Sequence, residues 1–539
     1  MTIGQLLRAG EVVGVGVRDS TPFVASGVAA DLLRTAGVEV AEASGGGALE
    51  VGGGIGCRLT WAGPVALPLR SEADVQAACG VMHVHGRRYG GPRLLGVDFA
   101  SVAAGVLAAG GTLAALRARE LGLPYREVEV SVAQAALLGL SQYLAAATAE
   151  EACVEPVGVG GPPFRSSDGV WFELEALGPD GWLRFWVELG VERRVVGRSW
   201  LPFQARYGTA TCPLPDELFV AAGRLTFAGL AALAERCGVD VTPVETWPAA
   251  VGGVPWRAVP GAAVQGAAEG AAEGAAEGAR PREAAAGGRG PLDGVTVVEV
   301  ARRVQGPMAG LVLGLLGARV VRVEPLGGDP LRGVPPMTAF GGEPVSARFA
   351  ALNRGKEVLE ADLRSSEGRA AVRELVRDSD VLLHSLAPSK VAGLGLDAET
   401  LEAVRPGLVH AQASGGAPGV TTDYPVQARS GLAALVAPPG LPPRPTLLTV
   451  CDVLGGLVCA TAAVAGLTAR ARTGRAQRVE SSLLSAARLL CGAVSGPGLP
   501  GEAIEVCTDL AALAGDPRFG GALDGSGCAV VRAPWEFRT

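Results

Sequence analysis

The chain contains few lysines, few histidines and no paired cysteine motif. Of its 539 residues, only two are lysine and four are histidine. The formal net charge of −7 leaves no basic footprint, so we expect no nucleic acid partner. The ten cysteines are scattered singly without a CxxC pair, which argues against a zinc site and against a disulfide framework. This cysteine usage favours a reducing, cytoplasmic location.

Long apolar runs are also missing. Met1–Gly10 lacks the apolar segment of a signal peptide, and we find no stretch of 18 uncharged apolar residues with transmembrane character. Val453–Leu467 is short and rich in alanine and glycine, so we interpret it as a buried helix and expect no membrane association. His83 and His85 have no Asp, Glu or Cys close by in the sequence. We interpret them as ordinary strand histidines and predict no metal site.

One block of sequence occurs twice. Val75–Leu138 aligns without a gap with Val426–Leu489, and Asp452 of the second copy stands opposite Ser101 of the first. A carboxylate can act as a nucleophile or base at neutral pH, whereas a serine hydroxyl without a base cannot. The repeat therefore predicts a catalytic copy and a degenerate copy in one polypeptide.

The composition divides the chain into four segments. AAEG occurs three times within residues 267–278, and such a segment cannot bury a core. We predict a degenerate large-domain copy at 1–150, a small α+β domain at 160–255, a low-complexity linker at 256–290, and a large-domain copy with the aspartate at 291–539. A chain of this length also needs more than one core.

The C-terminal segment alternates between strand and helix patterns. We expect strands at 295–300, 319–323, 380–383 and 408–412, and helices at 308–316 and 366–376. Ser365 is the expected N-cap of the last helix. This alternation predicts an α/β fold with a parallel, doubly wound sheet. The first copy opens with a fainter version, a helix at 24–37 and a strand at 38–40.

The C-terminal segment contains several motifs: Pro291–Val295 with Gly306-Pro307, Leu316–Glu324 with Gly328–Pro330, Leu352–Lys356 with Asp362-Leu363, Asp452 with Gly456, and Arg472–Gln477. Together they resemble the class III CoA-transferases, a family that includes formyl-CoA transferases, carnitine CoA-transferases and α-methylacyl-CoA racemases. The resemblance implies a duplicated, Rossmann-like CoA-transferase III fold. Because the family forms interlocked dimers, it also implies a fused pseudo-dimer in which the first copy lends its small domain to the active site.

The resemblance assigns Asp452 as the aspartate that attacks an acyl-CoA and forms covalent intermediates. From its position alone, Asp452 could instead be only the N-cap of the following helix. Arg302, Arg303, Gln305 and Lys356 are the expected contacts of CoA, since phosphates favour Arg and Lys. The alternative for the charged residues is a solvated surface.

Some family positions differ in this chain. Pro325 replaces an arginine of transferases, and Ser385-Leu386 replaces an asparagine-phenylalanine pair. Thr422 stands where racemases use a histidine, and Gly178 stands where they use a small-domain glutamate. Both racemase proton carriers are therefore missing, which argues against exchange of the α-proton.

The sequence thus predicts an enzyme that moves CoA from an acyl-CoA to a small carboxylic acid, with CoA as substrate and no bound cofactor. Two alternatives remain open: an isomerase, racemase or dehydratase with Asp452 as acid/base, and a non-catalytic CoA-binding protein. Because fusion supplies the family's partner, we expect a monomer or a weak homodimer.

Overall fold

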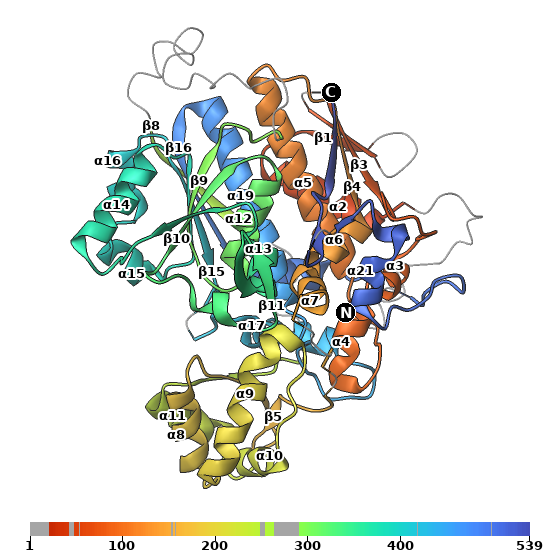
Figure 1. Ribbon diagram of the computed structural model, residues 1–539, viewed down its shortest axis with the longest axis vertical. Coiled ribbons are helices and arrows are strands. Elements are labelled where there is room, and N and C mark those ends of the chain that lie inside the picture. Colours follow the sequence, from red (N-terminus) through yellow and green to blue (C-terminus); the bar gives the residue numbers. More distant parts are fainter. Residues whose placement is uncertain are drawn as a thin grey trace, which may run out of the picture.

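The computed structural model describes residues 21–42, 48–52, 54–151, 155–156, 158–247, 254–263, 290–417, 419–496, 498–525 and 527–539. Within them, two sheets and a smaller lobe are arranged around a pair of long helices, α5 (Phe99–Glu120) and α19 (Val450–Thr473) (Figure 1). Both helices are rich in alanine and glycine, and their side chains are buried almost throughout.

The larger sheet has the order β13-β10-β9-β14-β15-β16-β8. Its strands are β9 (Thr296–Val300), β10 (Arg319–Glu324), β13 (Glu357–Glu360), β14 (Val381–His384), β15 (Val409–Ser414), β16 (Arg475–Ser482) and β8 (Trp256–Ala263). All pairs are parallel except β16 with β8. Numbered along the chain, the six parallel strands lie in the order 3-2-1-4-5-6, the order of dinucleotide-binding sheets.

Helices cover both faces of this sheet, which explains why its central strands β9, β10 and β14 are buried on both sides. The flanking helices are α12 (Gln305–Leu315), α13 (Ala347–Asn353) and α19 on one side, and α14 (Ser366–Arg377), α15 (Pro388–Gly393) and α16 (Ala398–Val404) on the other (Figure 1). Ser365 caps α14 by accepting a hydrogen bond from the N–H of Gly368, as the sequence predicts. The parallel α/β arrangement predicted for this segment is therefore present.

The smaller sheet has the order β1-β2-β3-β4-β19. It comprises β1 (Val40–Glu42), β2 (Ala48–Val51), β3 (Ile55–Thr60), β4 (Glu127–Ser131) and β19 (Trp535–Arg538), with α2 (Phe23–Thr35) packed on α5 beside it. The expected strand at 38–40 forms two residues later, at β1. This half has one parallel strand pair, β3 with β4.

The repeated block builds the same elements twice. The first copy contains α3 (Glu72–Ala78), α4 (Val81–Gly86), α5, β4 and α6 (Val132–Gly139); the second contains α17 (Asp423–Ser430), α18 (Leu432–Val436), α19, β16 and α20 (Leu483–Gly492). Each pair of helices starts at aligned residues. Ser131 and Ser482, which are aligned residues of the two copies, are the N-caps of α6 and α20.

The two copies face each other about a local two-fold axis. Thr461 of α19 lies against its own counterpart, Gly110 of α5: a Cβ at Gly110 would be 2.8 Å from the Thr461 hydroxyl oxygen. That hydroxyl donates to the carbonyl of Val106, and Thr468 further along α19 donates to the carbonyl of Leu113. Contact between equivalent positions is the signature of an isologous interface.

Each half also completes the sheet of the other. Strand β8, from the segment before the linker, pairs antiparallel with β16, whereas β19, at the end of the chain, pairs antiparallel with β4. Trp256 lies opposite Ser481, and Trp535 lies opposite Val130, the residue that aligns with Ser481. The predicted linker at 256–290 therefore begins only after Ala263, and its remainder, 264–289, lies outside the described residues.

Residues 164–243 form the smaller lobe, at the bottom of Figure 1. It has an antiparallel sheet of β5 (Phe164–Arg165), β6 (Trp171–Glu175) and β7 (Asp240–Pro243), with α8 (Pro179–Glu188), α9 (Arg193–Thr209), α10 (Asp216–Ala222) and α11 (Phe227–Cys237). Its core is a cluster of aromatic rings that includes Phe164, Phe172, Trp182 and Trp186.

The remaining described elements connect these parts: α7 (Ser141–Ala147), β11 (Met337–Phe340), β12 (Glu343–Ser346), α21 (Leu510–Gly515), β17 (Leu523–Asp524) and β18 (Val530–Val531). Helices α5 and α19 are long and apolar enough to cross a membrane by length and composition alone. In the fold they lie inside the protein, with 100% and 94% of their most apolar windows buried. The second helix is longer than the predicted segment 453–467.

Candidate active site

Asp452 is the third residue of α19 and is 9% exposed. The N-cap position belongs to Thr449, whose side chain makes no capping hydrogen bond. The alternative interpretation of Asp452 as an N-cap is therefore wrong: the carboxylate lies in the first helical turn, where the helix dipole favours a negative charge.

Asp423, the first residue of α17, supplies the cap that Thr449 does not. Its Oδ2 accepts a hydrogen bond of 2.6 Å from the backbone N–H of Asp452, and its Oδ1 accepts one from the Gln427 amide. Gln427 is held in turn by the backbone N–H and carbonyl of Thr446. Two buried carboxylates thus share the start of one apolar helix.

This arrangement changes the protonation of both acids. Burial raises the pKa of Asp423 to about 7. The pKa of Asp452 is raised well above its ordinary value by burial first and by the neighbouring Asp423 second, while Arg303 opposes the shift. Neighbouring carboxylates in a low dielectric resist joint ionisation, so the pair holds a proton more readily than isolated aspartates.

The loop between β9 and α12 brings two of the predicted residues to this pair. Arg303 is exposed and adopts a left-handed backbone conformation, φ +67°, which is uncommon outside glycine and often found at functional sites. Gln305 opens α12 and is buried, and its Nε2 has no hydrogen-bond partner among the described residues. A buried amide donor without a partner is available to an oxygen of a substrate.

Glycines in α19 allow this close approach. A Cβ at Gly455 would lie 3.0 Å from Gln305 Nε2, and a Cβ at Gly456 would lie 2.7 Å from the Gln305 carbonyl oxygen. Residue 456 is part of the aspartate motif identified in the sequence. Its role here is to let α12 pack directly on α19 one turn after Asp452.

The smaller lobe reaches the site through β6 and α9. Glu175, at the end of β6, accepts a 2.6 Å hydrogen bond from the hydroxyl of Thr422, the residue before Asp423. It also accepts hydrogen bonds from the hydroxyl of Tyr207 and from the guanidinium of Arg206. Gly178, which stands at the position of the racemase glutamate, is the N-cap of α8. A small-domain carboxylate is nevertheless present beside Thr422, at Glu175.

The first copy preserves the scaffold of this site without its reactive groups. Glu72, which aligns with Asp423, accepts hydrogen bonds from the backbone N–H and from the hydroxyl of Ser101. A Cβ at Gly105, the counterpart of Gly456, would lie 2.6 Å from the carbonyl oxygen of Ala25. Ala25 therefore occupies the place of Gln305, and the first copy lacks both the second carboxylate and the amide.

Two predicted CoA contacts have different environments. Arg302 is exposed on the loop between β9 and α12, at the carboxyl end of the parallel strands. The Lys356 side chain is 2% exposed and pairs with Glu299 at 2.8 Å, with further hydrogen bonds to Asn353 and the Pro307 carbonyl. The prediction that Lys356 contacts phosphate is wrong, because its ammonium is enclosed and neutralised by a buried carboxylate.

His83 and His85 lie in helix α4 and not in a strand, which corrects the sequence-based expectation. His83 pairs with Glu155 and His85 bonds the hydroxyl of Thr446. Each histidine thus has its own protein partner, on different segments. Across the described parts of the chain, no group of three or more His, Cys, Asp or Glu residues could hold a metal ion.

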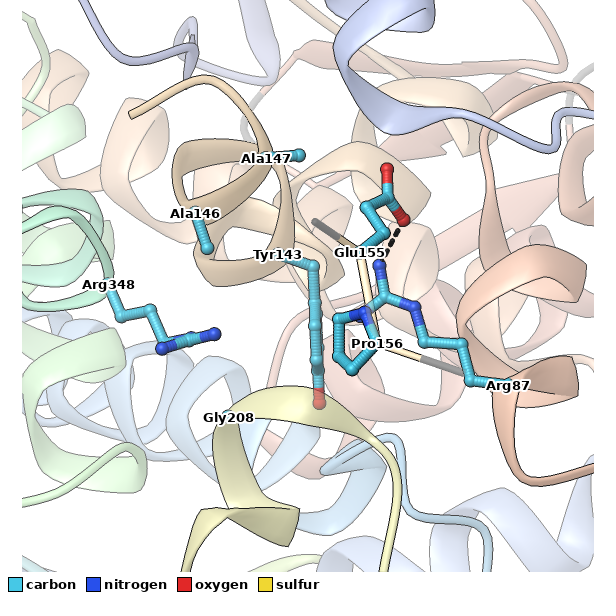
Figure 2. A pocket seen from close by; sticks show the side chains of 8 residues that line it. All are labelled: Arg87, Tyr143, Ala146, Ala147, Glu155, Pro156, Gly208 and Arg348. Atoms are coloured by element: carbon cyan, nitrogen blue, oxygen red, sulfur yellow. Dashed lines mark hydrogen bonds and ion pairs between the residues drawn. The ribbon is translucent and has the colours of Figure 1, made fainter. Parts of the chain in front are cut away.

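A small cavity of about 10 Å³ lies where the first half, the smaller lobe and the second half meet (Figure 2). It is lined by Arg87, Tyr143, Ala146, Ala147, Glu155, Pro156, Gly208 and Arg348. Arg87 forms an ion pair with Glu155 on one side of the Tyr143 ring, and Arg348 extends toward the ring from the other side. Asp452 does not line this cavity, which is a junction between the three parts of the chain.

Sequence comparisons place these features among known proteins. The sequence model of CoA-transferase family III matches residues 63–259 and 292–501. The succinate–glutarate CoA-transferase of Agrobacterium fabrum is 37% identical over 204 residues, 36% of this chain and 51% of that protein. The acetyl-CoA:oxalate CoA-transferase of Acetobacter aceti is 34% identical over 203 residues, again 36% of this chain and 51% of that protein. The chain therefore spans about half the length of the curated relatives that it matches.

Solved structures give a partial match. A CAIB/BAIF family protein from Brucella suis is 35% identical, with a TM-score of 0.36 over 37% of this chain and 55% of that one. The structure of Rv3272 from M. tuberculosis is 30% identical, with a TM-score of 0.34.

Proposed function

We propose that this chain, which belongs to CoA-transferase family III, moves CoA from an acyl-CoA to a carboxylic acid through a covalent intermediate on Asp452. The observation that carries the proposal is the difference between the two copies. The copy that retains a carboxylate at this place also retains the unpartnered Gln305 amide, whereas the other has Ser101 and Ala25.

The proposed reaction has four balanced steps. The ionised Asp452 attacks the thioester carbonyl, and CoA leaves as a thiolate to give a mixed anhydride. The thiolate then attacks the aspartyl carbonyl, which releases the first acid and leaves an aspartyl-CoA thioester. The acceptor carboxylate attacks that thioester and expels CoA thiolate. Finally, the thiolate attacks the new acyl carbonyl, which releases the new acyl-CoA and regenerates the carboxylate.

Named residues support particular steps. The Gln305 Nε2 is a donor for an oxyanion formed next to Asp452, and a desolvated donor of this kind is effective because no water competes with it. The positive charge of Arg303 favours the ionised form of Asp452. Arg302 remains the candidate for the phosphates of CoA, because it is exposed at the carboxyl end of the parallel strands, where nucleotide-binding sheets of this strand order hold their ligands.

The Rossmann-like sheet and the strand exchange support a fused pseudo-dimer. Since β8 and β19 already give each half a strand of the other, we propose a monomer or a weak homodimer. Size-exclusion chromatography with light scattering should give the mass of one or two chains, and a tight tetramer would contradict this part of the proposal.

Trapping the intermediate tests the main proposal. The chain is incubated with acyl-CoAs, beginning with succinyl-CoA and acetyl-CoA because relatives are named for succinate–glutarate and acetyl-CoA:oxalate transfer. Hydroxylamine then converts an activated aspartyl group to a hydroxamate, which peptide mass spectrometry locates. We expect it at Asp452 in the native chain and not in Asp452→Asn.

An unmodified Asp452 with every donor, together with measurable CoA binding, would contradict the covalent route. Deuterium incorporation at the α-carbon of the acyl group would then indicate acid/base chemistry, and its absence would indicate a CoA-binding protein without catalysis.

A further inference from the structure

The smaller lobe buries two glutamates where it meets the second half. Glu173 and Glu175 lie on the same side of β6, two residues apart, and both are almost completely buried. Both pair with one buried arginine, Arg206, at 3.0 Å and 3.5 Å. Burying two carboxylates against one guanidinium is costly unless further groups stabilise the second charge.

The groups that stabilise the second charge connect it to the candidate catalytic pair. The Oε2 atom of Glu175 accepts hydrogen bonds from Tyr207 of α9 and from Thr422. Thr422 immediately precedes Asp423, which in turn holds the backbone N–H of Asp452. Glu173, by contrast, meets the guanidinium of Arg206 and does not reach Thr422. The two glutamates therefore share a strand, an arginine and a degree of burial, but only Glu175 contacts the segment that carries Asp423.

We propose that Glu175 is a positioning residue of the first half, which holds the Thr422–Asp423 turn and places its carboxylate near the Asp423–Asp452 pair. The inference rests on the proposed function, since it assigns Glu175 an effect on the nucleophile of that reaction. It makes the small domain an electrostatic part of the active site.

The charges that act on Asp452 come from three other elements. Asp423 faces Asp452 from α17, Arg303 faces it from the loop after β9, and Glu175 faces it from β6. Around Glu175 itself lie Arg206 and Tyr207 of α9 and Asp240 of β7. Glu175 also raises the pKa of Asp452, although less than burial and Asp423 do.

The first test compares Glu175→Gln with Glu173→Gln. Each variant removes one buried carboxyl group beside Arg206, and glutamine keeps an oxygen that can accept a hydrogen bond. Burial raises the pKa of Glu173 to about 7, so its carboxyl is fully ionised only at the alkaline end of the pH range. Single-turnover formation of the Asp452 adduct is measured from pH 4 to pH 9. In Glu175→Gln, Asp452 loses a neighbouring negative charge and ionises more easily, so the acid limb should move to lower pH by roughly one unit. The limb of Glu173→Gln should stay near that of the native chain.

Equal shifts in the two variants, or no shift in either, would overturn the inference while leaving the proposed function intact. Glu175→Asp is the rescue variant: it keeps the charge, so its acid limb should lie closer to that of the native chain than the limb of Glu175→Gln does.

A second test does not depend on activity. Asp452→Asn is made in the native, Glu175→Gln and Glu173→Gln backgrounds, and the urea midpoint of unfolding is compared at pH 8. If the charge of Glu175 acts on Asp452, neutralising Asp452 raises the midpoint less in Glu175→Gln than in the native chain. In Glu173→Gln the gain should match that of the native chain.

Equal gains in all three backgrounds would overturn the inference even if the protein proves inactive. A chain that forms no adduct but shows the reduced gain in Glu175→Gln would contradict the proposed function and still support the electrostatic contact.

Discussion

Glu72 of the first copy and Asp423 of the second perform the same structural task. Each is the first residue of its helix, and each accepts a hydrogen bond from the backbone N–H that opens the facing long helix, of Ser101 in one case and Asp452 in the other. Gln76 and Gln427 support them with matching hydrogen bonds to the backbone. Stabilisation of the helix start is thus retained in both copies, while a second carboxylate remains in only one.

This relationship predicts the effect of restoring the lost aspartate. Ser101→Asp places a carboxylate beside Glu72, whose own pKa is already raised by burial. Since no arginine or lysine is among the described groups that act on Glu72, the new charge should destabilise the chain at pH 8 by about 3 kcal/mol or more. The introduced carboxyl has a raised folded-state pKa, so its protonated form carries no such cost. The loss should therefore shrink as the pH falls toward 4.

Urea unfolding of Ser101→Asp at pH 5 and pH 8, with Ser101→Asn as the neutral control, measures this effect. The variant should gain no hydroxamate at position 101, because Ala25 replaces the amide donor there. A second adduct at position 101, or equal stability at both pH values, would contradict the interpretation of the first copy as a scaffold.

The unpartnered amide of Gln305 predicts a transition-state effect. Gln305→Ala removes a buried donor that makes no hydrogen bond in the described part of the protein, so stability should change little. If the amide stabilises the oxyanion, kcat should fall about 10²–10³-fold with a smaller change in KM. Gly455→Ala provides an independent route to the same effect, since its new Cβ would lie 3.0 Å from Gln305 Nε2 and displace the amide. A rise in KM alone would assign Gln305 to substrate binding.

Much of the second half could be predicted because its signals are local. Apolar β-branched runs mark β9 and β10, and Ser365 marks the start of α14. Asp452 could be found because a gapless repeat places it opposite Ser101, which has no carboxylate. The repeat continues three residues further than the aligned block, to Glu72 and Asp423, and reading it that far would have identified the second carboxylate.

Other features depend on distant parts of the chain. Glu175 accepts a hydrogen bond from Thr422, which lies 247 residues away in the sequence, and no local sequence pattern predicts that contact. The exchanged strands β8 and β19 share a proline-tryptophan pair, at 255–256 and 534–535, which was a usable signal for their equivalence. Lys356 was misassigned because a lysine in a loop motif suggests a surface charge, whereas its partner Glu299 belongs to an earlier strand.

Lys356 and Arg302 should therefore respond differently to substitution. Lys356→Met leaves Glu299 buried with Arg322 as its remaining cation, and should destabilise the protein by about 3–5 kcal/mol. Arg302→Gln removes an exposed charge and should leave stability unchanged, but raise the KM for acyl-CoA several-fold if the residue binds phosphate. Urea unfolding and steady-state kinetics of both variants separate the roles. A stable Lys356→Met with a raised KM would restore the original assignment.

The last strand predicts how firmly the two halves are joined. Trp535 of β19 lies on β4 of the first half, is buried, and donates from its indole N–H to the carbonyl of Leu107 at 2.8 Å. Trp535→Ala opens a cavity beneath α5 and leaves that carbonyl without its indole donor, so the free energy of unfolding should fall by about 3–5 kcal/mol. Trp247→Ala is the control, since Trp247 is 62% exposed and its truncation should cost little.

If β19 is an integral strand of the first half, urea unfolding followed by circular dichroism should show the first half destabilised by Trp535→Ala although the substitution lies more than 400 residues away in the chain. Equal midpoints for the two variants would show that the exchanged strand contributes little to the union of the halves.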